Sequence, residues 1–314
     1  MGELVSVPPA VRDRLVVRFG PEVVGWLDAL PSLVGELTAR WNLEPVAAGG
    51  GGTSRVFRCV RRDTGASVWL KLTPEPAIAR EEAAALRAWA GRPSVVPLLA
   101  EELAVGALLL GDVRPGVQVK RLGWRLADIG PLLRDLRVPA VAPVPHSALR
   151  PLTHRVDFVF DLTLRRLAAA GVGEPFDAGV LDRARAAALE LAVDGPLGLV
   201  HGDLNPANVL SGPGADTVAG PGQAPAPAPA LVAIDPRPAW GDPDFDAVDW
   251  VLDAVTDHAD LERRIDTLAA LVPGMSPARV LRWCRALGVL DAALRFCAGR
   301  HGPETRFLLT LSRT

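Results

Sequence analysis

The sequence has no tyrosine, few cysteines and no long apolar run. Its three cysteines, Cys59, Cys284 and Cys297, are scattered and lack metal-binding spacing, so we expect reduced thiols. No stretch of about 18 uncharged apolar residues is present, and the first residues show no apolar signal-peptide core. We therefore expect a cytoplasmic protein without a membrane span. The lack of tyrosine predicts nothing about function.

Neither sign of charge is in large excess, since 34 basic and 36 acidic residues give a formal net charge of −2. A nearly neutral chain has no general electrostatic attraction for nucleic acid or an anionic membrane, and we expect neither as a partner. With 314 residues, 49% of them hydrophobic, the chain can build one large domain or two lobes. We expect a monomer or a weak dimer.

The order of the expected elements indicates an α+β protein. Helical periodicity covers 9–41, where Pro21 and Pro31 should break the helix. Strand patterns and one further helix follow: strands at 44–48, 55–60, 67–73, 95–100 and 107–110, with the helix at 77–90. From about 115 the pattern is mainly helical. We predict a small β-rich lobe with a leading helical segment, residues 1–113, and a larger mainly helical lobe, residues 114–314.

Residues 211–230 have a composition unlike the rest of the chain. Proline, glycine and alanine fill most of these positions, and such a segment cannot form a packed core. We predict a flexible surface loop between two short strands, tolerated as an insertion at a hairpin tip.

The run from His201 to Asn208 carries the strongest functional signal. Asp203 and Asn208 lie five residues apart in a loop containing Gly202 and Pro206, and an apolar strand downstream ends in Asp235. Enzymes that transfer phosphoryl groups in the manner of protein kinases use this layout. Asp203 can orient and deprotonate an attacking hydroxyl, and the oxygens of Asn208 and Asp235 suit magnesium. His201 is expected to brace the loop.

A lysine and a glutamate upstream are consistent with a nucleotide site. Lys71 interrupts an apolar strand, and Glu82 lies on the helical stripe formed by Ile78, Leu86 and Trp89. A carboxylate on that inward face needs a cationic partner, because an unpaired buried charge costs several kcal/mol. Lys71 is the nearest candidate, and such pairs hold the α- and β-phosphates of ATP in kinases.

Two further segments are predicted to contact the nucleotide. Four glycines precede Thr53 and Ser54, and their backbone amides can approach phosphate oxygens closely; we assign Gly51, Gly52, Thr53 and Ser54 to this loop. The strand at 107–110 leads into Asp112 and Val113. In a two-lobed kinase these two residues would form the hinge whose backbone groups bind adenine.

Acidic residues downstream give two open interpretations. Asp246, Asp249, Asp253 and Asp257 follow helical spacing, which predicts one acidic helix face. That face is either simply solvated or a wall that attracts a cationic substrate. Asp157 and Asp161, on a helix near 152–170, are further candidates for contact with a cationic acceptor.

Several strings resemble a known group of enzymes. HGDLNPANVL and AIDPRPAWGDPDFDAVDW resemble the aminoglycoside phosphotransferases, and more narrowly the aminoglycoside/hydroxyurea antibiotic resistance kinase family. WLDALPSLVGELTARWNL, REEAAALRAWAG and ALLLGDVRPG extend the resemblance over most of the chain.

The resemblance implies a bilobal protein-kinase-like fold, ATP as donor, magnesium ions and a small-molecule acceptor hydroxyl, with a streptomycin-type aminoglycoside first among acceptors. Asp203 would then be the catalytic base, Asn208 and Asp235 the metal ligands, and Asp246 a brace for the catalytic loop. Two alternatives stay open. The acceptor could be hydroxyurea, an amino sugar or another metabolite, or the chain could be a nucleotide-binding pseudokinase scaffold.

Overall fold

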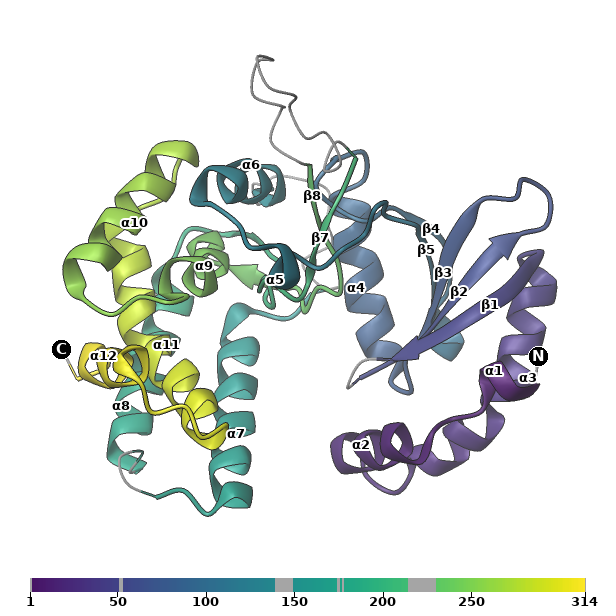
Figure 1. Ribbon diagram of the computed structural model, residues 1–314, viewed down its shortest axis with the longest axis horizontal. Coiled ribbons are helices and arrows are strands. Elements are labelled where there is room, and N and C mark those ends of the chain that lie inside the picture. Colours follow the sequence, from purple (N-terminus) through teal and green to yellow (C-terminus); the bar gives the residue numbers. More distant parts are fainter. Residues whose placement is uncertain are drawn as a thin grey trace. The chain divides into compact units, whose positions relative to one another are not determined.

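In the computed structural model, the chain folds into two compact units (Figure 1). Unit 1 comprises residues 1–91 and 96–113, and unit 2 comprises residues 92–95 and 114–314. The structure describes residues 2–50, 53–138, 149–173, 176, 178–213 and 230–313. Most of the segment predicted as a loop at 211–230 lies outside the described residues.

Five strands of the described chain form the sheet of unit 1. They are β1 (Leu43–Gly50), β2 (Arg55–Arg61), β3 (Ser67–Leu72), β4 (Leu98–Glu102) and β5 (Ala107–Gly111), in the order β1-β2-β3-β5-β4 with antiparallel neighbours. The fourth strand starts later than predicted: Val95 makes only an isolated bridge to Ala233. A short helix η1 (Leu103–Val105) links β4 to β5.

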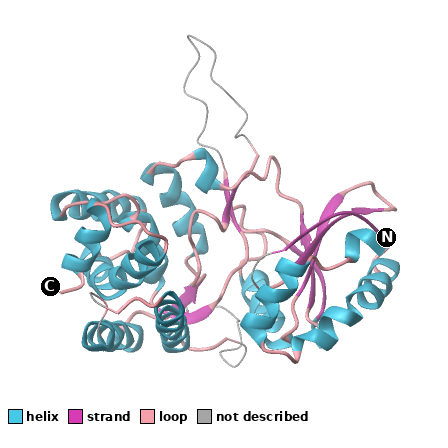
Figure 2. Cartoon of the chain, turned by 60° about the horizontal axis from the view of Figure 1, so that its bottom comes forward, coloured by secondary structure: helices cyan, strands magenta, loops and turns pink. Residues whose placement is uncertain are grey.

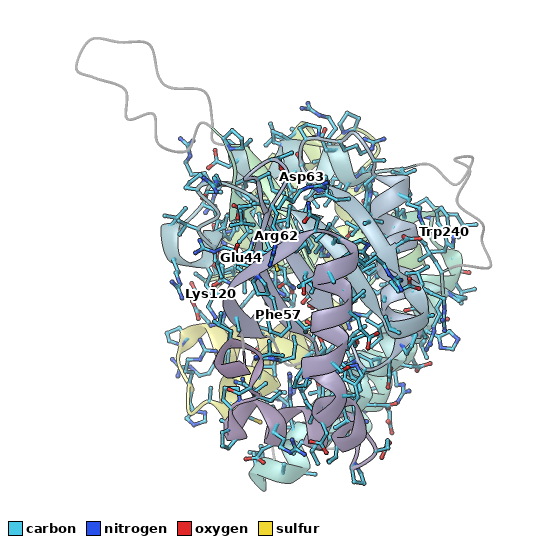
Figure 3. The ribbon with its side chains drawn as sticks, turned by 90° about the vertical axis from the view of Figure 1, so that its right-hand side faces the viewer. Glu44, Phe57, Arg62, Asp63, Lys120 and Trp240 are labelled. Atoms are coloured by element: carbon cyan, nitrogen blue, oxygen red, sulfur yellow. The ribbon has the colours of Figure 1, made fainter. Side chains whose placement is uncertain are left out.

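The turn between β2 and β3 has the predicted position, and Figure 3 labels Asp63 within it. Gly65 has φ +70°, a left-handed conformation that glycine adopts without steric cost. The Arg61 amide donates to the Ala66 carbonyl at 2.9 Å and closes the turn. This hairpin aligns β3, and with it Lys71, against β2.

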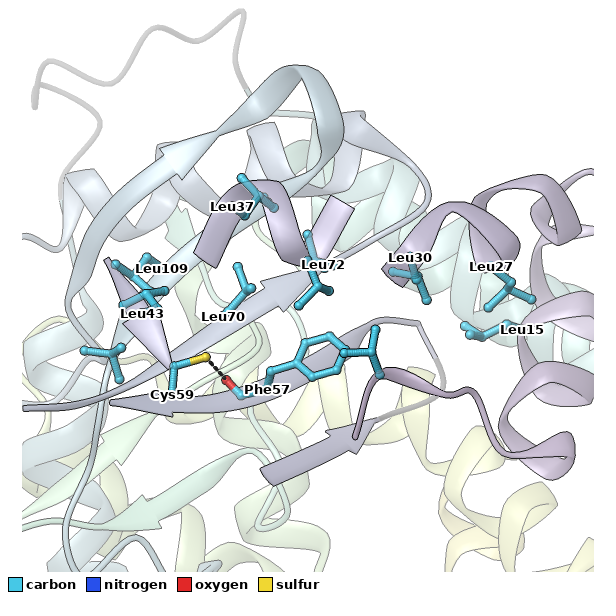
Figure 4. Close-up of a cluster of buried hydrophobic side chains, with 14 of the residues drawn as sticks. Leu15, Leu27, Leu30, Leu37, Leu43, Phe57, Cys59, Leu70, Leu72 and Leu109 are labelled. Carbon is cyan, nitrogen blue, oxygen red and sulfur yellow. Dashed lines mark hydrogen bonds between the residues drawn. The ribbon is translucent and has the colours of Figure 1, made fainter. Parts of the chain in front are cut away.

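Three helices precede the sheet: α1 (Gly2–Val5), α2 (Pro9–Phe19) and α3 (Val23–Arg40). The predicted break at Pro21 is confirmed, but the one at Pro31 is wrong, because α3 continues through that proline. Leu27, Leu30 and Leu37 of α3 are buried in one core with Phe57 and Leu70 of the sheet (Figure 4). Burying such side chains stabilises by about 1.5–3 kcal/mol each, which outweighs the roughly 3 kcal/mol cost of a proline inside a helix.

The core contains one of the cysteines. Cys59 is buried in β2, and its thiol donates to the carbonyl oxygen of Phe57 at 3.6 Å (Figure 4). Burial raises the pKa of Cys59 to about 11. All three cysteines are free, as the sequence predicted.

A further helix, α4 (Pro76–Ala88), completes unit 1 and packs against β4 and β5. Its buried side chains include Ala79, Glu82, Ala83 and Leu86, close to the predicted stripe.

Unit 2 is mostly helical, with two short strand pairs (Figure 2). Its helices are α5 (Val119–Leu122), α6 (Leu126–Leu136), α7 (Leu152–Ala170), α8 (Ala178–Asp194), η3 (Pro243–Ala247), α9 (Val248–Leu252), α10 (His258–Leu271), α11 (Pro277–Cys297) and α12 (Pro303–Leu311). Strands β6 (Gly198–Val200) and β9 (Ala239–Gly241) form one pair, and β7 (Val209–Ser211) and β8 (Leu231–Ala233) the other. Among the described helices, none is long and apolar enough to cross a membrane.

Candidate active site

The predicted pair of Lys71 and Glu82 is present in unit 1. The Lys71 ammonium lies 2.7 Å and 2.6 Å from the two carboxylate oxygens of Glu82, and the side chains are only 7% and 1% exposed. Strand β3 presents Lys71 opposite Val56 of β2 and Leu108 of β5, so neighbouring strands hold its backbone on both sides. The pairing itself is confirmed, and its role in binding nucleotide phosphates stays a prediction.

The glycine-rich segment joins β1 to β2. The ladder extends to the pair Gly50 and Arg55, which limits the connection to four residues. Gly51 and Gly52, assigned to phosphate contact, lie outside the described residues. Thr53 accepts a hydrogen bond through its carbonyl from the Thr73 hydroxyl at 3.4 Å, and Ser54 is buried.

The predicted hinge residues follow the end of β5. The indole nitrogen of Trp69 donates to Asp112 Oδ1 at 2.8 Å, which ties the side chain of Asp112 to β3. Asp112 is the first residue after β5, which ends at Gly111. The chain passes from unit 1 to unit 2 between Val113 and Arg114.

The segment from His201 to Asn208 forms the connection between β6 and β7 in unit 2. The Asn208 amide donates to Asp203 twice, to the backbone oxygen at 2.9 Å and to Oδ2 at 2.8 Å. The two side chains therefore meet at one point, as the loop spacing predicted. Asn205 stabilises the same turn, because its Oδ1 accepts from the Ala207 amide at 3.0 Å.

Asp246 braces this loop from η3. Its carboxylate accepts from the backbone amides of His201 at 2.6 Å and Gly202 at 2.9 Å, so the predicted bracing is confirmed. Burial raises the pKa of Asp246 to about 7, while the two amide donors and the nearby arginines Arg137 and Arg155 act in the opposite direction.

Asp235 lies two residues beyond the end of β8, which ends at Ala233. The Ile234 amide donates to the Asn208 carbonyl at 2.9 Å, which places Asn208 and Asp235 at the same end of the β7–β8 ladder. Asp235 has φ +56°, a strained conformation for a residue with a side chain. An arginine lies beside it, with Arg237 Nη2 3.5 Å from Asp235 Oδ1.

Gly202 is required by the close approach of two chain segments. The Arg237 amide donates to the His201 carbonyl at 2.8 Å, and a Cβ added at Gly202 would lie 2.1 Å from the Arg237 carbonyl oxygen. Its φ of +75° is unfavourable for any residue with a side chain.

We expect Gly202→Ala to destabilise the protein by roughly 1–3 kcal/mol and to reduce turnover sharply, because the loop must shift to relieve the clash. Thermal unfolding and initial rates measure both effects. Gly35→Ala is the matched control: that helical glycine has open space around its Cβ position, so its replacement should be neutral or stabilising by up to about 1 kcal/mol. Equal behaviour of the two variants would contradict the assigned crowding.

The prediction of one acidic helix face at 246–257 is wrong. Helix α9 ends at Leu252, Asp253 follows it, and Ala254 has φ +57°, so Asp257 begins a new helix as the N-cap of α10. Spacing along the sequence cannot show where the backbone leaves the helix, here through the extended Asp253 and the left-handed Ala254.

The first acids of this region are buried and paired. Asp242 accepts from Arg279 Nε at 2.7 Å and from the Trp283 indole at 2.8 Å, and Asp244 forms an ion pair with Arg137. They hold α11 and the chain after α6 against η3. Their role is therefore structural.

The three acids predicted to contact the acceptor have different surroundings. Asp157 and Asp161 of α7 are both paired with Arg185 of α8, at 2.6 Å and 2.8 Å, so a cationic acceptor would have to compete with that arginine.

Asp249 of α9 is exposed. Protein atoms around its carboxylate nevertheless displace hydration and raise its pKa to about 7, and the carboxylates of Asp203 and Asp291 act in the same direction. Water also reaches this side chain, and its hydration of the carboxylate acts in the opposite direction.

The sequence did not predict that Arg155 would lie beside Asp203. Arg155 of α7 donates from Nε to the Gly202 carbonyl at 2.6 Å and from Nη2 to Asp203 Oδ1 at 2.9 Å. Arg155 lies 48 residues before Asp203. In the sequence analysis, only the acidic residues of its helix were considered for a role in the site. No spacing rule connects the two positions, and only the packing of α7 brings them together.

The sequence is similar to those of known proteins. The sequence model of the aminoglycoside/hydroxyurea antibiotic resistance kinase family matches residues 40–299. The chain is 30% identical over 292 residues to streptomycin 6-kinase from Streptomyces glaucescens, covering 90% of this chain and 88% of that protein. It is 29% identical over 296 residues to hydroxyurea phosphotransferase from Kitasatospora aureofaciens, covering 90% and 78%.

Solved structures are similar in fold. Choline kinase LicA from Streptococcus pneumoniae has a TM-score of 0.56 at 11% identity, with 90% of this chain and 99% of that chain covered. Aminoglycoside phosphotransferase APH(4)-Ia has a TM-score of 0.50 at 16% identity, with 90% and 98% covered.

The fold is thus that of the protein-kinase-like phosphotransferases, and the β-rich and helical parts match the predicted fold class. The chain belongs to the aminoglycoside/hydroxyurea antibiotic resistance kinase family. The predicted family and enzyme class, a kinase that phosphorylates small molecules, are confirmed.

Proposed function

We propose that this protein transfers the γ-phosphoryl group of ATP to a hydroxyl of a streptomycin-type aminoglycoside and so acts as an antibiotic resistance kinase. The observation that carries the proposal is the 30% identity to streptomycin 6-kinase over nearly the whole of both chains. The complexes of LicA with AMP and of APH(4)-Ia with ADP and AMP-PNP support adenine nucleotide as the donor.

In this proposal Asp203 orients the acceptor hydroxyl and takes its proton as the phosphoryl group is transferred. The hydrogen bonds from Asn208 and Arg155 hold both carboxylate oxygens in place. Lys71, fixed by Glu82, binds the α- and β-phosphates, with the amides at 51–54 close to them. Backbone groups of Asp112 and Val113 bind adenine.

The residues at the β7–β8 end fit a magnesium ion. The Asn208 nitrogen is engaged by Asp203, which leaves the amide oxygen as a ligand, and Asp235 offers a partly exposed carboxylate. Amide and carboxylate oxygens with water are the ligands that magnesium prefers. When bound, the ion neutralises charge on the phosphates. We propose Asn208 and Asp235 as its protein ligands.

A panel of acceptors tests the proposal. Purified protein with MgATP is offered streptomycin, hygromycin B, hydroxyurea and choline, and the phosphorylated product is identified by mass spectrometry. Phosphorylated streptomycin is the expected result. Phosphorylated hydroxyurea alone would favour the second candidate, which the 29% identity to hydroxyurea phosphotransferase supports. ATP binding without transfer to any acceptor would revive the pseudokinase scaffold.

The acceptor is proposed to be cationic, because Asp249 is exposed next to the negative charges of Asp203 and Asp291. Asp157 and Asp161 remain candidates if the acceptor displaces Arg185. We further propose that the protein is cytoplasmic, since its donor nucleotide is found there, and that it is a monomer or weak dimer.

Asp249→Asn should raise the KM for a cationic acceptor about tenfold with little change in kcat, because a charge-assisted contact is lost. The raised pKa of Asp249 means that its carboxylate gains charge as pH rises toward about 7. The wild-type KM should therefore fall between pH 5.5 and 8, and the fall should be weaker in the variant. Asp266→Asn, at an exposed carboxylate of α10, is the control. A variant with wild-type KM at every pH would exclude this contact.

A further inference from the structure

The catalytic loop contains no lysine or arginine side chain of its own. Residues 201–208 include no lysine or arginine, so a cation beside Asp203 must come from another part of the fold. In the structure that cation is Arg155, in the first turns of α7.

Arg155 donates hydrogen bonds to two consecutive residues of the loop. Nε donates to the Gly202 carbonyl and Nη2 to the Asp203 carboxylate, at 2.6 Å and 2.9 Å. The planar fork of the guanidinium group sends a separate nitrogen to each acceptor, whereas a lysine ammonium would have to reach both acceptors from one nitrogen.

The arrangement divides the two oxygens of Asp203 between two donors. Oδ1 accepts from Arg155 and Oδ2 from Asn208, which together prevent rotation of the carboxylate about its Cβ–Cγ bond. Each ionised oxygen can accept more than one hydrogen bond, and the Asp203 side chain is 34% exposed. An acceptor hydroxyl can therefore still bind to a carboxylate that is already oriented.

Arg155 is itself held firmly. Its side chain is 14% exposed, and its guanidinium carbon lies 5.5 Å from the ring centre of Phe158. Arg237 is close enough to repel it, while Asp249 and Asp246 attract it. Keeping the Arg155 guanidinium charged while it is largely buried costs free energy. A neutral hydrogen-bond donor would bond to the Gly202 carbonyl equally well without that cost. Among the carboxylates that attract this charge, Asp203 contributes most, so the charge is matched to Asp203 rather than to the loop backbone.

We propose that Arg155 is a positioning residue for phosphoryl transfer, which acts through Asp203 by fixing the direction of its carboxylate toward the acceptor hydroxyl. The proposal rests on the proposed role of Asp203 but not on the identity of the acceptor. A misdirected base affects the chemical step and leaves nucleotide binding unchanged.

Arg155→Ala should lower kcat about 100-fold and change the KM for ATP less than threefold. Arg155→Lys should recover only part of the loss, and millimolar guanidinium chloride should restore activity to the alanine variant. Arg282→Ala, at an exposed arginine paired with Glu190, should retain wild-type kcat and gain nothing from guanidinium. Thermal unfolding of each variant checks that the fold is intact.

A double-mutant cycle then separates positioning from general support of the loop. If Arg155 acts through Asp203, adding Arg155→Ala to Asp203→Asn should cause almost no further loss. Additive losses, an unchanged kcat in Arg155→Ala, or no recovery with guanidinium would overturn the proposal.

Each rate is measured with the acceptor and also as ATP hydrolysis without it. Wild-type hydrolysis without phosphorylation of any aminoglycoside would refute the proposed function alone. The effect of Arg155 would still be read from hydrolysis, because water then takes the place of the acceptor hydroxyl.

Discussion

Replacing Asp203 by asparagine should lower kcat for phosphoryl transfer by about 10³, while the affinity for ATP stays nearly unchanged. A carboxamide has almost the shape of the carboxylate, and its oxygen can still accept the bond from Arg155. It cannot, however, take up a proton from the acceptor hydroxyl. The loop should therefore stay folded while the chemical step fails. Initial rates and nucleotide titration separate the two quantities.

The control for this variant is Asp266→Asn, which removes a carboxylate from the exposed face of α10. It should retain wild-type kcat and KM. Asp203→Asn with more than a tenth of wild-type turnover would mean that Asp203 is not the base, and the proposed mechanism would be wrong. A large fall in melting temperature would instead indicate that the loop depends on the charge of Asp203 for folding.

Glu82→Ala should lower the free energy of unfolding by about 3–5 kcal/mol, because it leaves the Lys71 ammonium buried without this carboxylate. Chemical denaturation measures the loss. Glu190→Ala removes a carboxylate from an exposed pair with Arg282 and should cost no more than about 1 kcal/mol. Similar costs for the two variants would show that the burial of the Lys71 pair has little energetic consequence.

A second variant separates stability from function at this pair. Replacing both residues, Lys71→Met with Glu82→Leu, should recover most of the lost stability, because apolar side chains of similar size need no charge partner. If Lys71 binds the nucleotide phosphates, this stable protein should nevertheless have lost affinity for ATP. A stable double variant with normal ATP affinity would restrict the pair to a structural role.

The elements predicted best are those whose signal is local. The residues Asp63 to Ala66 predicted the β2–β3 turn, and the spacing of Glu82, Leu86 and Trp89 predicted the inward face of α4. Pro31 was misjudged because local propensity assigns it a cost that the core around Leu27 and Leu30 outweighs. The predicted acidic face at 246–257 was wrong because the backbone leaves the helix at Asp253 and Ala254, and the next helix begins only at His258.

By itself, the sequence determined the family, the fold class and the chemical groups of the site. A loop with Asp203 and Asn208, a strand end at Asp235, and Lys71 with Glu82 are local patterns whose chemistry depends on residue type and spacing. Only the tertiary structure decided the partners of those groups. Arg155 reaches Asp203 because α7 packs beside the loop, and Arg185 occupies the carboxylates of Asp157 and Asp161 because α8 packs beside α7. Contacts between distant segments depend on how whole helices pack, and the pattern around a single residue does not contain that information.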